Sequence, residues 1–373
     1  MQGMIELLEQ CVSIPSLSGQ EQHVAIFLRD EMLRRGFDHA FIDDAGNAVG
    51  IVGAGSRQMV LLGHMDTVGG DVPVRYDDGK LYGRGTVDAK GSLCAFVLAA
   101  EVIADARRKS QDQSSSVLRL ASDFQLIVIG AVEEEAATSK GARFAATHYA
   151  PEFCIIGEPS GMDGITLGYK GRLLADVYVG RAMQHTAGPG ASASETAVDF
   201  WMWVKSYVDK FNAGKEKVFD QIQLSLRSIQ SGDDGLSEWC NMEIGLRLPL
   251  EFEPALAKEV FGKAFTDVAT RTVIGRASIS FRGEESAYRS SKESPLARAF
   301  VDAIRAEKMR PAFKLKTGTA DFNVVGPVWN CPIVAYGPGD SSLDHTPNEH
   351  VSIDEFEKAV KVLTDVLQSL MQL

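Results

Sequence analysis

The sequence predicts an α/β protein in which a mostly parallel sheet is flanked by helices and a smaller domain is inserted. Apolar runs rich in β-branched residues, such as FQLIVIGA at 124–131, alternate with helical patterns. Such runs are typical of strands buried on both faces, so the alternation predicts a parallel sheet covered on both sides. The length of 373 residues also favours two domains, because one hydrophobic core stops growing at about 250–300 residues.

The elements of the main domain follow from the spacing of apolar residues. Apolar positions at helical spacing predict helices, and short apolar runs predict strands. Helices are expected at 3–13, 20–35, 91–108, 294–306 and 353–370, and strands at 48–52, 59–62, 124–131, 153–157 and 332–336. The polar segment SQDQSSS at 110–116 predicts a solvated loop.

The insert is predicted at residues 172–286, which divides the main domain into 1–171 and 287–373. Its pattern gives the order βαββαβ, which is the ferredoxin-like arrangement. Strands are expected at 173–180, 221–229, 242–250 and 273–281, and helices at 194–211 and 254–271. We interpret the insert as a lid.

Composition and charge argue against several classes of function. The net charge is -12, from 50 acids and 38 bases, without a run of Lys and Arg, so we expect no nucleic-acid partner. No apolar stretch approaches the roughly 18 residues of a membrane span. The start, MQGMIELLEQ, lacks the features of a signal peptide, and we expect a cytoplasmic protein. The five cysteines are scattered and include no CxxC pair, which favours reduced thiols.

The first candidate for chemistry is His64, which follows the apolar run MVLLG. This position is the carboxyl end of a predicted parallel strand, where α/β sheets form their sites. Strand alternation places Asp66 on the same side as His64, where its carboxylate could fix the tautomer of the imidazole. A hydrogen-bonded histidine at a loop edge remains an alternative from this motif alone.

Two further motifs supply carboxylates. The glycine-rich loop GRGTVDAKG at 83–91 reaches Asp88 just before a predicted helix, where the alternative is a helix N-cap. Three adjacent acids, Glu133, Glu134 and Glu135, follow the strand at 124–131. Their mutual repulsion is costly unless cations neutralise them, although a solvated acidic loop is the alternative.

Glu158 follows a third predicted strand, and His345 follows a fourth after a glycine-rich turn. The combined set contains imidazoles and carboxylates at the strand ends of one sheet, without a cysteine. It fits two divalent ions bridged by a carboxylate, with zinc favoured and cobalt or manganese accepting similar ligands. Such a pair lowers the pKa of water and polarises a carbonyl, while a free carboxylate serves as general base.

Together the motifs GHMDTV, GRGTVDAKG, VEEEA, GEPS and HTPNE strongly resemble the metallopeptidase family of aminoacylase, acetylornithine deacetylase, succinyl-diaminopimelate desuccinylase and glutamate carboxypeptidase. The resemblance covers nearly the whole chain. It implies that His64 and Glu158 complete one metal site, that Glu135 and His345 complete the other, that Asp88 bridges them, that Glu134 is the general base and that Asp66 supports His64. Ala89 and Ala136 depart from the family pattern but leave these acids intact.

The same resemblance assigns roles within the insert. His185, in QHTAGP, is similar to the family's histidine that crosses a dimer interface and stabilises the oxyanion of the tetrahedral intermediate. The resemblance therefore implies a homodimer formed through the lid. Arg247, in LRLP, matches the family's arginine for a substrate carboxylate, and its fork of donors suits that role.

A closer resemblance is carried by KTGTADFN at 316–323 and YGPGDSSLDH at 336–345. These segments look like the branch that releases lysine or ornithine from the γ-carboxyl of a C-terminal glutamate on an amino-group carrier protein, in lysine and arginine biosynthesis. This branch implies that Thr319 and Asn323 contact substrate. The alternatives are an acetylornithine deacetylase, a succinyl-diaminopimelate desuccinylase, or an inactive binding homologue.

Overall fold

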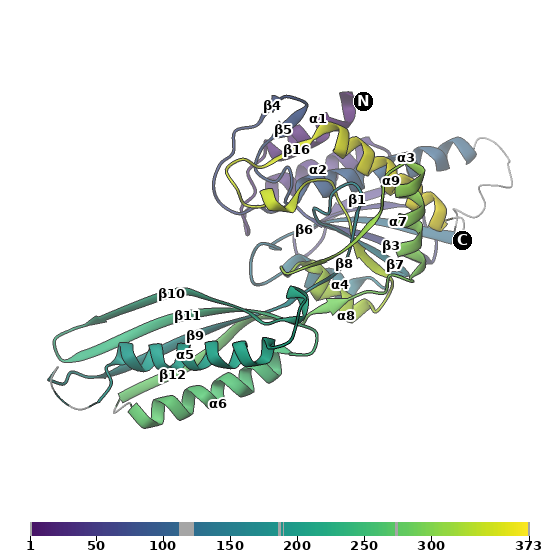
Figure 1. Cartoon of the computed structure of the whole chain (residues 1–373). Helices are drawn as coiled ribbons and strands as arrows, with labels where there is room; N and C mark the ends of the chain where they lie inside the picture. The colour runs from purple at the N-terminus through teal and green to yellow at the C-terminus, as the bar shows by residue number, and fades with distance from the viewer. Residues whose placement is uncertain (1, 112–122, 186–187, 189, 273–274, 372–373) are drawn as a thin grey trace. The chain divides into compact units, whose positions relative to one another are not determined.

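The computed structural model describes residues 2–111, 123–185, 188, 190–272 and 275–371 (Figure 1). The predicted loop at 110–116 lies mostly outside these residues, as does the start of the predicted strand at 273–281. The chain forms two compact units. Unit 1 comprises Met1–Gly168, Ser290–Leu315 and Ala320–Leu373, and unit 2 comprises Tyr169–Arg289 and Lys316–Thr319. The second, short segment of unit 2, Lys316–Thr319, was not expected from the sequence.

The larger sheet has four parallel strands at its centre. Its order is β1 (His39–Ile42), β2 (Ala48–Val52), β6 (Phe124–Ala131), β3 (Arg57–His64), β7 (Phe153–Gly157), β15 (Ile333–Ala335), β8 (Gly164–Tyr169) and β13 (Tyr288–Arg289), with β14 (Ala312–Lys316) paired to β8. Strands β6, β3, β7 and β15 run parallel to their neighbours in this group. The outer strands β2 and β8 pair antiparallel with β6 and β15. The prediction of a mostly parallel central sheet is confirmed.

Helices cover both faces of this sheet. On one face, α2 (Gln22–Arg34), α3 (Lys90–Gln111) and α7 (Pro295–Ala306) contact the strands, and α1 (Gln2–Val12) and α9 (Ile353–Met371) pack against α3 (Figure 1). Helices α4 (Lys140–His148) and α8 (Asp321–Trp329) pack against each other and contact β6 and β15. In β3, Met59 and Leu61 belong to the core formed with the first group of helices. Val60 and Leu62 alternate with them and are equally buried. This burial on both faces explains the continuous apolar run.

Unit 2 has the predicted order of elements, βαββαβ. Its elements are β9 (Gly171–Ala182), α5 (Ala193–Asn212), β10 (Gln223–Asp233), β11 (Ser237–Leu248), α6 (Pro254–Thr272) and β12 (Gly275–Glu285). The strands form an antiparallel sheet in the order β10-β11-β9-β12, with both helices on one face (Figure 1). Ser192 and Glu195 form a reciprocal capping box at the start of α5, which satisfies N–H groups that a helix start leaves unpaired.

A small third sheet brings two distant segments together. Strand β16 (His350–Ser352) pairs antiparallel with β5 (Lys80–Tyr82), which pairs with β4 (Arg75–Asp77). Two short 3-10 turns, Val218–Asp220 and Ser341–Leu343, complete the described elements. Within the described ranges, no helix has the length and apolar character that crossing a bilayer requires.

Candidate metal centre

The central parallel strands deliver the predicted ligands to one edge of the sheet. His64 is the last residue of β3 and pairs in register with Ala131, the last residue of β6. On the other side of β3, Gly63 pairs with Gly157, the last residue of β7. Because parallel strands end at the same edge, the segments that follow β6 and β7 begin beside His64.

Asp88 lies between the two imidazoles. Its Oδ1 atom is 3.2 Å from Nε2 of His64, and its Oδ2 atom is 3.0 Å from Nε2 of His345. Glu158 approaches the first imidazole, with Oε1 3.9 Å from Nε2 of His64. Glu135 approaches the second, with Oε1 2.8 Å from Nε2 of His345. The structure therefore brings the five predicted ligands together in two groups that share Asp88.

Asp66 connects His64 to the loop that carries the paired glutamates. Its Oδ1 atom accepts a hydrogen bond of 3.1 Å from the main-chain N–H of Glu134 and lies 3.4 Å from Nδ1 of His64. Its Oδ2 atom accepts hydrogen bonds from the N–H of Glu135 (3.0 Å) and the hydroxyl of Ser18 (2.7 Å). Nδ1 of His64 lies 3.1 Å from the main-chain carbonyl oxygen of Asp66, whereas the buried carboxylate fixes the position of the acidic loop. The role of the carboxylate in orienting the imidazole stays a prediction.

Two further buried side chains hold the same loop. Oε1 of Glu21 accepts a hydrogen bond of 3.0 Å from the N–H of Glu133, and Oδ1 of Asn47 accepts one of 3.1 Å from the N–H of Val132. Glu133 has φ of 58°, a left-handed conformation that costs energy for a residue with a side chain. Sequence reasoning missed Glu21 and Asn47, because nothing near them in the chain indicates the loop they contact.

The two imidazoles are held in an acidic environment that favours their charged forms. Burial alone would lower the pKa of His64, but its hydrogen bonds with Asp66 and Asp88 outweigh burial and raise the pKa well above its ordinary value. Hydrogen bonds with Asp88 and Glu135 raise the pKa of His345 to about 10. The imidazoles therefore supply part of the positive charge that the carboxylates require.

The carboxylates respond to their surroundings in different ways. Burial raises the pKa of Glu134 well above its ordinary value, and nearby carboxylates add to the effect. Burial also raises the pKa of Glu135. By contrast, the hydrogen bonds of Asp88 with His345 and His64 overcome its burial and lower its pKa. The upward shift of the pKa is larger for Glu134 than for Glu135.

The donor set fits a pair of divalent cations. Five carboxylates, from Asp66, Asp88, Glu134, Glu135 and Glu158, gather around two imidazoles. Two imidazolium ions cannot neutralise five carboxylates, and buried charges of one sign are costly without compensation. Nitrogen and oxygen donors without sulfur suit zinc, cobalt or manganese. Asp88 has one oxygen directed at each imidazole, as a bridging ligand needs.

The other predicted site residues lie in different places. His185 is exposed and follows β9 in unit 2. Also in unit 2, Nη1 of Arg247 donates a hydrogen bond to Oγ1 of Thr319, so the structure brings these two residues together. Asn323 lies in unit 1 near the start of α8, where its Oδ1 atom accepts a hydrogen bond of 3.0 Å from the N–H of Ala320.

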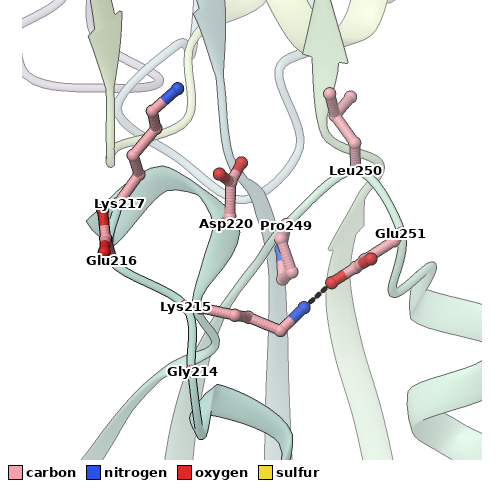
Figure 2. A pocket seen from close by; sticks show the side chains of 8 residues that line it. All are labelled: Gly214, Lys215, Glu216, Lys217, Asp220, Pro249, Leu250 and Glu251. Carbon is pink, nitrogen blue, oxygen red and sulfur yellow. Dashed lines mark ion pairs between the residues drawn. The ribbon is translucent and has the colours of Figure 1, made fainter.

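A cavity of about 490 Å³ lies in unit 2 (Figure 2). It is lined by Gly214, Lys215, Glu216, Lys217, Asp220, Pro249, Leu250 and Glu251. Figure 2 shows Lys215 directed at Glu251, with which it forms an ion pair. The lining includes none of the residues predicted from the sequence to carry out chemistry.

The fold and the shared cluster of imidazoles and carboxylates are those of a metal-dependent hydrolase. The chain belongs to Peptidase family M20/M25/M40, whose sequence profile matches residues 60–369. The resemblance expected from the sequence motifs is therefore confirmed.

Individual relatives match over nearly their full length. A protein from Deinococcus radiodurans named LysW-lysine hydrolase is 48% identical, covering 98% of this chain and 96% of its own. A relative from Thermococcus kodakarensis is 36% identical, covering 98% of this chain and 92% of its own. The crystal structure of an M20 family metallo-carboxypeptidase, Sso-CP2 from Sulfolobus solfataricus, matches with a TM-score of 0.76 and 17% identity over 100% of both chains. The last comparison supports the fold alone.

Proposed function

We propose that this protein is a metal-dependent amide hydrolase that releases L-lysine, L-ornithine or both from an amino-group carrier protein. The bond cleaved joins the amino acid to the γ-carboxyl of the carrier's C-terminal glutamate. The observation that carries the substrate assignment is the 48% identity, over 98% of the chain, with the LysW-lysine hydrolase of Deinococcus radiodurans. The relative from Thermococcus kodakarensis has a provisional name that covers both lysine and ornithine conjugates.

His64 and Glu158 would hold one metal ion, Glu135 and His345 would hold the second, and Asp88 would contact both. Zinc is the metal that we propose, because imidazole and carboxylate ligands without thiolate suit it. When bound, such a pair of ions lowers the pKa of water and polarises the carbonyl of the scissile amide. The distances of Asp88 from the two imidazoles support its role as the shared ligand.

Glu134 is the proposed general base. Its carboxylate takes a proton from the attacking water, and the water oxygen forms a bond to the carbonyl carbon. The proton then passes from Glu134 to the nitrogen of the departing amino acid as the C–N bond breaks. An oxygen of Glu134 lies within 4.8 Å of ligand atoms of His64 and Glu135, which supports this role because a general base must lie beside the water from which it takes the proton.

The developing oxyanion needs a donor that is in place before the reaction. We assign this role to His185, contributed by the unit 2 of a partner subunit, so the active form in our proposal is a homodimer. Its exposure and its position after β9 are compatible with contact to another chain.

Arg247 and Thr319 are the proposed residues for a substrate carboxylate. The guanidinium group can donate two parallel hydrogen bonds to a carboxylate, and its hydrogen bond to Thr319 orients it. Asn323 is the third residue that we propose to contact substrate, because it lies in the same segment, 316–323, as Thr319. Its Oδ1 atom accepts a hydrogen bond from the N–H of Ala320.

A substrate panel tests the proposal directly. Initial rates are measured with carrier-lysine, carrier-ornithine, free γ-glutamyl-lysine, acetylornithine and succinyl-diaminopimelate at equal concentration. We expect turnover of at least one carrier conjugate and a steep loss with the free γ-glutamyl compound, which lacks the protein surface of the carrier. Faster turnover of acetylornithine or succinyl-diaminopimelate would instead assign the protein to a small-molecule deacylase.

A further inference from the structure

Glu349 is a fully buried acid that none of the proposed catalytic steps uses. It lies four residues after His345, at the start of the segment that forms β16. The pairing of β16 with β5 places His350 opposite Tyr82. The main-chain carbonyl of Glu349 extends this pairing by accepting a hydrogen bond of 3.3 Å from the N–H of Gly83. The segment after β5 therefore enters the Asp88 loop directly alongside Glu349.

One oxygen of Glu349 accepts three main-chain hydrogen bonds from that loop. Oε1 receives the N–H groups of Gly85 at 2.9 Å, Val87 at 3.0 Å and Asp88 at 3.1 Å. Three donors that converge on one atom determine the path of the backbone between them. Because the last donor is the N–H of Asp88 itself, the contact acts on the residue whose carboxylate faces both imidazoles.

The second oxygen forms an ion pair that is largely shielded from solvent. Oε2 of Glu349 accepts a hydrogen bond of 2.6 Å from Nη1 of Arg84. The same arginine donates through Nε to the carbonyl of Gly70 and through Nη1 to the carbonyl of Thr346. Arg84 therefore orients Glu349 and also contacts the residue that follows His345.

These contacts connect the loop of Asp88 with the segment of His345. We propose that Glu349 is a positioning residue that holds Asp88 between the two proposed metal sites. Its backbone lies in the segment of His345, while its side chain holds the loop of Asp88. One residue thus sets the shared ligand and a ligand of the second site relative to each other. This inference rests on the proposed metal centre, since Asp88 must be the shared ligand for its placement to matter.

A plain structural salt bridge is the competing explanation, and two conservative variants separate it from positioning. Glu349→Gln keeps the side-chain length and an Oε1 acceptor for the three N–H groups, but loses the negative charge. Glu349→Asp keeps the charge but withdraws the acceptor by one methylene. If Glu349 acts by positioning the loop, Glu349→Gln should be the milder variant, because its side-chain oxygen can still accept the three main-chain hydrogen bonds. A role in charge alone predicts the opposite order.

The glutamine variant also places an amide N–H₂ group against the donors of Arg84. The double variant Arg84→Met/Glu349→Gln removes this conflict and should recover part of any loss. Arg35→Met is the matched control, because it removes another buried arginine, which forms ion pairs with Glu31 and Glu101 and does not contact the Asp88 loop. It should lower thermal stability without changing metal binding.

The measurement is a Co²⁺ titration of the full-length, metal-depleted protein, followed by visible absorption and calorimetry, with the thermal midpoint recorded for each variant. The wild-type protein should bind two equivalents. In Glu349→Asp we expect affinity for one or both ions to fall by about 10–100-fold, the usual cost of losing an outer-shell partner, with an altered absorption spectrum at saturation. With carrier-lysine, kcat should fall while KM changes little.

If Glu349→Asp bound Co²⁺ with the affinity and spectrum of the wild type, the inference would be overturned. It would also be overturned if Glu349→Gln and the double variant both lost more Co²⁺ affinity than Glu349→Asp. Either result leaves the proposed metal centre intact. Failure of the wild-type protein to bind two equivalents of Co²⁺ would instead refute the metal centre itself, so the two failures are distinguishable.

Discussion

The carboxylate of Asp66 accepts a hydrogen bond of 3.1 Å from the main-chain N–H of Glu134. A residue that follows β3 thereby fixes the proposed general base on the loop that follows β6. The same carboxylate lies beside Nδ1 of His64, so a proposed metal ligand and the proposed base share one anchor.

Asp66→Asn should weaken metal binding and turnover together. Asparagine has one acceptor oxygen where Asp66 uses two, so an amide N–H₂ group would face the N–H of Glu134 or Glu135. We expect metal affinity to fall by about 10–100-fold, measured by Co²⁺ titration. Ser18→Ala removes a single donor to Oδ2 and should give a clearly smaller loss. Equal affinities in Asp66→Asn and the wild type would contradict the anchoring role.

Glu134→Gln should retain both metal ions and lose nearly all activity. Glutamine preserves the shape but cannot take a proton from water, and general-base contributions are typically about 10²–10⁴-fold. The matched control is Glu133→Gln. Oε2 of Glu133 accepts a hydrogen bond from the hydroxyl of Thr138 and has no proposed role in proton transfer, so this variant should keep most of its activity. Metal content by elemental analysis and kcat with carrier-lysine are the two readouts.

Glu135→Ala should behave in the opposite way to Glu134→Gln. It removes an oxygen that lies 2.8 Å from Nε2 of His345. Metal occupancy of the second site should therefore fall, and the loss of activity should follow from the missing metal ion. Identical metal content and near wild-type activity in Glu134→Gln and Glu135→Ala would refute the proposed division of roles.

A shared active site predicts complementation between two inactive variants. His185→Ala lacks the proposed oxyanion donor, and Glu134→Gln lacks the proposed base. A mixed dimer has one site that receives both intact groups, so mixing and reassociating the subunits should restore up to about half of the wild-type activity per heterodimer. If every mixture stays inactive while heterodimers form, His185 does not serve the partner's site.

Lys170 should make the stability of unit 2 depend on pH. Its buried Nζ donates hydrogen bonds to the carbonyl of Val218 at 2.9 Å and to Oε1 of Gln223 at 3.1 Å. Burial lowers the pKa of Lys170 from 10.5 to about 8. Between these values the unfolded chain binds the proton and the folded chain does not, so the free energy of unfolding rises with pH.

The matched variant is Lys170→Met, which removes the titrating group. The stability of the wild type relative to Lys170→Met should therefore increase from pH 8 to pH 10.5, as measured by urea unfolding at several pH values. Loss of the amine removes the donor of the part-buried hydrogen bonds to Val218 and Gln223, which costs about 1–3 kcal/mol. A difference between the two proteins that stays constant over this range would show that Lys170 has an ordinary pKa.

The strands that carry the candidate site could be predicted because their sequence reflects burial on two faces. His64, Glu134, Glu135 and Glu158 were located by counting from the ends of β3, β6 and β7, where polar residues interrupt apolar runs. The order of elements in unit 2 was also predicted, since alternating strands and amphipathic helices leave a local pattern. These features depend on short-range periodicity, which a single sequence contains.

Other elements could not be predicted because their local sequence opposes or hides them. Helix α8 contains Gly326 and Pro327, both unfavourable in a helix interior, and its buried position stabilises it nonetheless. Helix α4 has nine residues and begins after a left-handed Ser139. The contacts of Glu349 are still less accessible, because the N–H of Gly85 lies 264 residues earlier in the chain.

The position of β15 has a consequence for synthesis of the chain. This strand lies between β7 and β8, yet its residues are translated only after the whole of unit 2. Until then the fully buried β7 is an uncovered apolar edge on a growing polypeptide, and such edges recruit other unpaired strands. Nascent chains that stall before Ile333 should therefore be prone to aggregation and dependent on chaperones, although most of the sheet has already left the ribosome.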